Sequence, residues 1–214
     1  MDPHLPHQEG GHLIMAIRYT PPADERIEFL RPTLIAIFSR DTPENREALR
    51  GSDASKIRVD HAHRIHFMEL EDVVLGRPAS STKSALLRYL VYVNERAIAD
   101  AELFSDPNEV LHFAAVNYGP VAPATVRGIG LLQELARVRE GDYELRSLQI
   151  PALHFVSLWL HGVADDLFLP IAPTPAHLMS RDRVLTERAL MDSLRAEAAE
   201  LMRRYASAPG DSGG

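Results

Sequence analysis

The 214-residue chain contains no cysteine. Disulfide bonds, thiolate zinc sites, iron–sulfur clusters and cysteine nucleophiles are therefore excluded, and a metal ion would need histidine or carboxylate ligands. A chain of this length buries enough apolar surface to fold around one core without a disulfide or a structural metal. We accordingly expect one domain that needs no metal or other cofactor to fold.

Lysine is almost missing, because Lys56 and Lys83 are the only two. Acidic residues outnumber lysine and arginine by 30 to 23, and the formal net charge is −7. Duplex nucleic acids are bound mainly by basic side chains that neutralise phosphates, so this balance argues against a nucleic-acid partner. The arginine bias is typical of GC-rich bacterial genomes, which predicts a bacterial source, and arginine favours bidentate contacts with anionic partners.

Long hydrophobic runs are also missing, since no apolar stretch approaches the roughly 20 residues of a membrane-spanning helix. Residues 1–11 have neither the basic start nor the apolar stretch of a signal peptide. Like residues 207–214, they are polar and contain glycine and proline, so we predict two disordered tails around one globular domain, 12–206. These features predict a cytoplasmic protein without a membrane partner.

Two common catalytic signatures are absent: the phosphate-binding Gly-x-x-x-x-Gly-Lys loop and the zinc-binding His-Glu-x-x-His pair. Their absence favours a non-catalytic role over an enzyme but does not decide between the two. The interpretation therefore depends on the pattern of helices and strands and on two groups of side chains.

Alternation with a period of two residues is clearest over 57–67, where isoleucine, valine, histidine and phenylalanine occupy every second position. This pattern is typical of a strand with one face on the core. Together with the other apolar segments it predicts an α+β fold with a mixed or antiparallel sheet of about five to six strands. The other predicted strands are 13–19, 33–39 and a meander formed by 143–150, 153–160 and 167–169.

Helices are predicted from capping residues and from apolar side chains three and four positions apart. For example, Thr42 and Pro43 are a cap and a first helical residue, and Leu86, Leu90 and Val93 lie on one helical stripe. We expect a central helical insertion in the sheet and an amphipathic helix at the C-terminus. The predicted helices are 43–50, 80–98, 107–118, 123–140 and 181–205.

His61 and His63 are the best candidates for a metal site. On a regular strand their imidazoles lie on the same face, about 7 Å apart, and two such groups can bind one ion. Glu69 has the same parity and could join them after a bend in the chain. The alternative, which we prefer, is that both imidazoles lie in the core and bond to carbonyl or carboxylate groups.

The C-terminal helix carries Met191, Leu194, Leu201 and Tyr205 at roughly heptad spacing. Such a stripe must be covered either by the core or by a partner. We predict that it binds a protein partner or a second copy of the chain. The sequence thus favours a non-catalytic intracellular accessory protein that binds a protein or assembles with itself. The alternative is a metal-dependent enzyme of small-molecule metabolism with His61 and His63 as ligands of a divalent ion.

Overall fold

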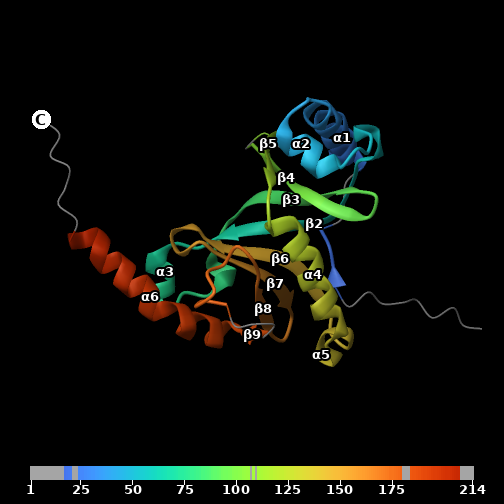
Figure 1. The fold of residues 1–214 in the computed structure, drawn as a ribbon. Helices are drawn as coiled ribbons and strands as arrows, with labels where there is room; N and C mark the ends of the chain where they lie inside the picture. Colours follow the sequence, from blue (N-terminus) through green and yellow to red (C-terminus); the bar gives the residue numbers. More distant parts are fainter. Residues whose placement is uncertain (1–16, 21–23, 107, 109, 180–183, 208–214) are drawn as a thin grey trace, which may run out of the picture.

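A computed structural model describes residues 17–20, 24–106, 108, 110–179 and 184–207 (Figure 1). The predicted tail 1–11 and residues 208–214 of the second predicted tail lie outside the described residues, whereas Ser207 ends the last helix. In chain order the elements are β1 (Ile17–Arg18), α1 (Asp24–Phe38), α2 (Pro43–Leu49), β2 (Arg58–Phe67), α3 (Leu70–Leu75), β3 (Ser84–Val93), β4 (Arg96–Ser105), β5 (Leu111–Tyr118), α4 (Val121–Glu134), α5 (Ala136–Arg139), β6 (Tyr143–Ile150), β7 (Phe155–Gly162), β8 (Asp166–Pro170), β9 (Leu185–Thr186) and α6 (Glu187–Ser207).

The strands form one mixed sheet of nine strands in the order β5-β4-β3-β2-β6-β7-β8-β9, with β1 beside β6. Most neighbours are antiparallel, but β2 and β1 both run parallel to β6. The sheet therefore consists of two antiparallel halves that meet at the β2–β6 pair, and α4 and α5 connect one half to the other. The α+β class is confirmed, and the sheet is larger than the five to six strands predicted.

Several local predictions are confirmed. Residues 58–67 of the predicted strand 57–67 form β2, the meander forms β6 to β8, and helices α2, α4 and α6 lie within or near their predicted ranges. At α2 the Thr42 hydroxyl accepts a hydrogen bond from the Asn45 N–H, at 3.2 Å, and Pro43 is the first helical residue. No helix in the described residues is long and apolar enough to cross a bilayer.

The predicted central helices 80–98 and 107–118 are wrong, because these segments form β3, β4 and β5. A strand covered on both faces needs apolar residues at nearly every position, and residues 88–93 are all buried, so their spacing could not distinguish strand from helix. Asn94 and Glu95 have φ values of 49° and 61°, as the two central residues of a type I′ hairpin turn require. The Asp106 carboxylate accepts the N–H groups of Asn108 and Val110 at the next turn.

The predicted strand 33–39 is also wrong, since it is the second half of α1. Leu30, Leu34 and Phe38 recur every four residues and pack against β3 and β4. Burial of this helical stripe overrides the preference of the β-branched residues for a strand.

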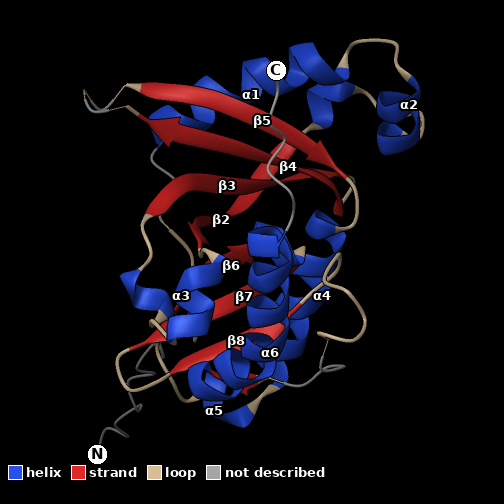
Figure 2. Ribbon diagram, turned by 90° about the vertical axis from the view of Figure 1, so that its left-hand side faces the viewer, coloured by secondary structure: helices blue, strands red, loops and turns tan. Residues whose placement is uncertain are grey.

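Helices cover the two faces of the sheet differently (Figures 1 and 2). One face is covered by α4 and α5, whose apolar side chains pack on β6 to β8. The opposite face carries two separate helix pairs, α1 with α2 over β3 and β4, and α3 with α6 over β6 to β8. The register shows that both pairs lie on this face. Arg64 of β2 lies beside Leu87 of β3 and beside Arg146 of β6, and residues paired across neighbouring strands project to the same face of a sheet. The boundary between the pairs runs along β2 and β6.

Close packing of α4 on the sheet requires Gly128. A Cβ atom at this position would lie 2.7 Å from Leu158 Cδ1 and 3.3 Å from Ile171 Cγ2, whereas one at Gly130 would contact nothing within 4 Å. We expect Gly128→Val to lower the free energy of unfolding by about 1–3 kcal/mol through overpacking. Gly130→Ala, the matched control, should raise it by about 0.5–1 kcal/mol. Urea unfolding measures both, and equal effects would contradict the packing argument.

Candidate binding cleft

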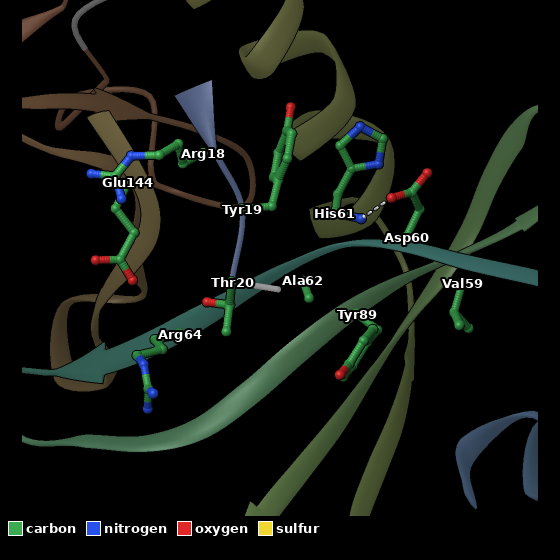
Figure 3. A pocket seen from close by; sticks show the side chains of 10 residues that line it. All are labelled: Arg18, Tyr19, Thr20, Val59, Asp60, His61, Ala62, Arg64, Tyr89 and Glu144. Carbon is green, nitrogen blue, oxygen red and sulfur yellow. Dashed lines mark hydrogen bonds between the residues drawn. The ribbon is translucent and has the colours of Figure 1, made fainter. Parts of the chain in front are cut away.

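A cleft lies where β1 leaves β6 and runs beside β2. β1 pairs with the start of β6, and the Thr20 N–H then donates a hydrogen bond to the Ala62 carbonyl, at 2.9 Å. The cleft has a volume of about 720 Å³ and lies at the boundary between the two helix pairs (Figure 3). Its lining residues are Arg18, Tyr19, Thr20, Val59, Asp60, His61, Ala62, Arg64, Tyr89 and Glu144.

The backbone of β2 is interrupted at His61. This residue has a φ of 53°, a left-handed conformation that is uncommon outside glycine, and the pairing with β3 shifts between Asp60 and His63. The Asp60 carboxylate accepts the His61 N–H at 2.7 Å, which stabilises the bulge. A bulge of this kind re-aims a side chain, so the alternation predicted for His61 and His63 breaks at this point.

Figure 3 shows that Tyr19 and His61 project to one side of β2, while Arg64 and Tyr89 project to the other. On the first side the His61 Nδ1 lies 2.9 Å from the Tyr92 hydroxyl, and the Tyr19 ring meets the imidazole edge-on at 4.9 Å. Burial lowers the pKa of His61, and burial together with Asp60 raises the pKa of Tyr19 to about 12. At neutral pH these groups are therefore uncharged hydrogen-bonding groups.

Two buried hydroxyls border the cleft without a partner among the described residues: Thr20 Oγ1 and the Tyr89 hydroxyl. Tyr89 is 0% exposed and Thr20 is 7% exposed. An unpaired buried hydroxyl costs about 1–3 kcal/mol, so native proteins usually provide a partner from the chain, water or a ligand.

Most of the charged groups in the cleft are already neutralised. Arg18 pairs with Asp142, Asp60 with Arg58 and Glu144 with Arg146. Arg64 differs, because it forms no ion pair with any residue that the structure describes. The cleft thus offers hydroxyl, imidazole and phenol groups together with one guanidinium that has no counter-ion in the described part of the chain.

The structure does not bring the predicted metal ligands together. His63 is fully buried and donates its Nδ1–H to the His61 carbonyl at 2.7 Å, whereas His61 lies half-buried between two tyrosines. Glu69 is exposed and precedes α3. Within the described residues, no three histidine or carboxylate side chains form a group that could hold a metal ion. The metal site stays a prediction.

Apart from His61, the residues that line the cleft are absent from the sequence-based candidates; Tyr19, Thr20, Arg64 and Tyr89 are among those missed. The sequence does not single out Arg64, because β2 contains two other charged residues, Arg58 and Asp60. Tyr89 carries no signal either, because its segment is predicted as a helix. Thr20 joins the site through the hydrogen bond from its N–H to the Ala62 carbonyl of β2, which depends on residues far away in the chain.

The predicted partner-binding stripe is divided along α6. Met191 and Leu194 are buried within the chain in the cluster that α6 forms with α3, while Leu201 is half-buried. Tyr205 is 62% exposed. A partner could therefore reach only the outer end of the helix, and partner binding there stays a prediction.

Leu194→Ala is expected to lower the free energy of unfolding by about 2–4 kcal/mol, because the side chain is 0% exposed and its removal leaves a cavity. Tyr205→Ala, near the exposed end of the same helix, should change it by about 0.5 kcal/mol or less. Chemical denaturation compares the two. A larger effect at Tyr205 than at Leu194 would mean that the helix docks differently.

The chain matches no protein-family model, no curated protein and no solved structure. The cleft is therefore interpreted from its own residues.

Proposed function

We propose that the chain is a non-catalytic binding protein whose ligand, a small organic molecule with hydrogen-bonding groups, occupies this cleft. The observation that carries the proposal is that Thr20 and Tyr89, whose buried hydroxyls have no partner among the described residues, both line this cavity. A ligand that bonds to both would remove the cost of leaving them unpaired.

The size and chemistry of the cleft support this proposal. Its volume of about 720 Å³ falls in the range of roughly 300–1,000 Å³ that is usual for small-molecule sites. Tyr19 provides aromatic surface, and His61 and Thr20 provide polar groups that can orient a ligand. Because the carboxylates that line the cleft are ion-paired, a neutral molecular body fits it better than a cation.

The proposal keeps the non-catalytic role inferred from the sequence and changes the ligand from a protein to a small molecule. A protein partner or a second copy at the outer end of α6, the bacterial source and the cytoplasmic location stay predictions.

The test is a titration of isotope-labelled protein with neutral aromatic fragments that carry hydroxyl or amide groups, followed by NMR. We expect signals of Thr20, His61 and Tyr89 to shift together with at least one fragment. If no fragment shifts these signals, or if the shifts gather elsewhere, the proposal is wrong.

Removal of the two hydroxyls separates binding from stability. Thr20→Val and Tyr89→Phe should each leave the free energy of unfolding unchanged or raise it by up to about 1 kcal/mol, because an unpaired group is lost. Each should weaken fragment binding by roughly threefold to tenfold. Thr125→Val is the matched control, since its hydroxyl is also buried and unpartnered among the described residues but lies outside the cleft. An equal loss of affinity in the control would contradict the assignment.

A further inference from the structure

A second, smaller pocket adjoins the cleft and shares Arg64 with it. It has a volume of about 150 Å³ and lies between α1 and the β2–β4 part of the sheet. Arg26 and Arg64 both line it, together with the hydroxyl-bearing Ser84 and Ser105 and an apolar floor that includes Leu87 and Leu103. None of its described lining residues is acidic.

The register explains how the two arginines meet. Arg64 of β2 lies beside Leu87 of β3, which lies beside Leu103 of β4, so the three form one row on the face that α1 covers. Arg26 belongs to the first turn of α1 and lines the pocket above this row.

Tyr89 lines the cleft but not the smaller pocket. Burial raises its pKa, and the charge of Arg26 opposes that rise. The Tyr89 hydroxyl has no hydrogen-bond partner among the described residues that meets normal geometry.

Neither arginine has a counter-ion among the residues that the structure describes. The buried Arg88 and the half-buried Arg146 both contact carboxylates, but Arg26 and Arg64 form no ion pair with a described residue. Arg64 is exposed and Arg26 is half-buried, so water screens part of the repulsion between these two like charges, and an anion bound beside both would reduce it further. The formal net charge of −7 makes this local excess of positive charge unusual for the molecule.

We propose that this pocket binds a tetrahedral oxyanion of the phosphate type, held by Arg26 and Arg64 and assisted by the serine hydroxyls. Planar guanidinium groups match phosphate oxygens with paired hydrogen bonds, and such charge-assisted bonds are stronger than neutral ones. The volume of about 150 Å³ corresponds to about five water molecules, which accommodates one such anion and little more. This proposal does not depend on a ligand in the cleft.

The test is calorimetric titration with inorganic phosphate at low ionic strength. We expect saturable binding that weakens by about tenfold or more in Arg26→Gln and in Arg64→Gln. Arg64→Lys should bind with intermediate affinity, because it keeps the charge and loses the planar geometry. Arg127→Gln is the matched control, since Arg127 is exposed on α4 and forms no ion pair with a described residue, and it should bind like the unsubstituted protein.

Phenyl phosphate distinguishes a free anion from the phosphate group of a larger ligand. Tighter binding than that of inorganic phosphate, lost again in Thr20→Val, would indicate that the organic part reaches the cleft. Equal binding of the two probes would assign the pocket to the free anion and would count against the cleft proposal alone. Absence of phosphate binding, or equal binding by the Arg26, Arg64 and Arg127 variants in protein shown to be folded by circular dichroism, would overturn the inference.

Discussion

Arg88→Ala is expected to lower the free energy of unfolding by about 3–5 kcal/mol, since it removes one side of a buried ion pair. The Arg88 side chain is 6% exposed and lies in the middle of β3. Its Nε is 3.1 Å from Asp100 Oδ1, and its Nη2 is 2.5 Å from Glu102 Oε1. With its amide oriented toward the guanidinium, the Gln149 oxygen accepts from Nη2 at 2.9 Å.

The cost arises mainly from the carboxylates that would be left behind. Asp100 is 1% exposed, its remaining partner is the Asn117 amide at 2.9 Å, and burial already raises its pKa against the opposing effect of Arg88. Without Arg88 this carboxylate and that of Glu102 would face each other without a cation between them.

Two further variants make the Arg88 experiment decisive. Arg204→Ala breaks an exposed helical pair with Glu200 and should cost less than about 1 kcal/mol. Arg88→Met combined with Asp100→Asn and Glu102→Gln should recover part of the lost stability, because no buried charge is then unpaired. Urea unfolding measures all of them, and an Arg88→Ala effect no larger than that of Arg204→Ala would refute the argument.

Acidification from pH 7 to pH 4.5 is expected to destabilise the protein by about 5 kcal/mol through His63 and His66. Burial, followed by the charge of Arg88, lowers the pKa of His63 to about 3. Burial, followed by the charge of Arg146, lowers the pKa of His66 to about 4. Both imidazoles have an ordinary pKa near 6.5 in the unfolded chain.

The sign follows from proton uptake. Between pH 6.5 and about pH 4 the unfolded chain binds protons on both histidines and the folded chain does not, so the unfolded state gains stability as the pH falls. Each histidine contributes about 1.4 kcal/mol per pH unit in this window. The raised pKa of Asp100 acts in the opposite direction and offsets part of the loss.

Urea unfolding at a series of pH values measures this dependence. His63→Gln and His66→Gln should each remove about half of the slope, whatever their effect at pH 7. Leu194→Ala provides the control, because it should lower the whole curve without a change in slope. An unchanged slope in both histidine variants would show that neither imidazole is kept neutral by burial.

The elements that could be predicted from the sequence are those with local signals. Thr42 and Pro43 start α2 through a cap and a proline that involve only adjacent residues. The apolar positions of α6 predict a helix, because they lie within a few residues of one another. The segment of β3 has no comparable signal, since a strand covered on both faces is apolar at positions that also suit a helix, and residues 88–93 are all buried.

The candidate site was predictable only in part. His61 stands out in the sequence, but its left-handed backbone and its contacts with Tyr19 and Tyr92 depend on how β3 and the segment after β1 lie beside β2. The burial of His63 also depends on the strands beside β2, and it agrees with the core position that we prefer from the sequence.

By itself, the sequence determined which chemistry is open to this protein: no thiol is present, arginine supplies nearly all of the positive charge, and the net charge is −7. These properties depend on composition and hold in any fold. Only the tertiary structure decided that Arg26 and Arg64 share one pocket and that Thr20 and Tyr89 border one cleft. Such groups form when strands and helices distant in the chain pair and pack, and the free energy that selects this arrangement comes from burial of the whole core.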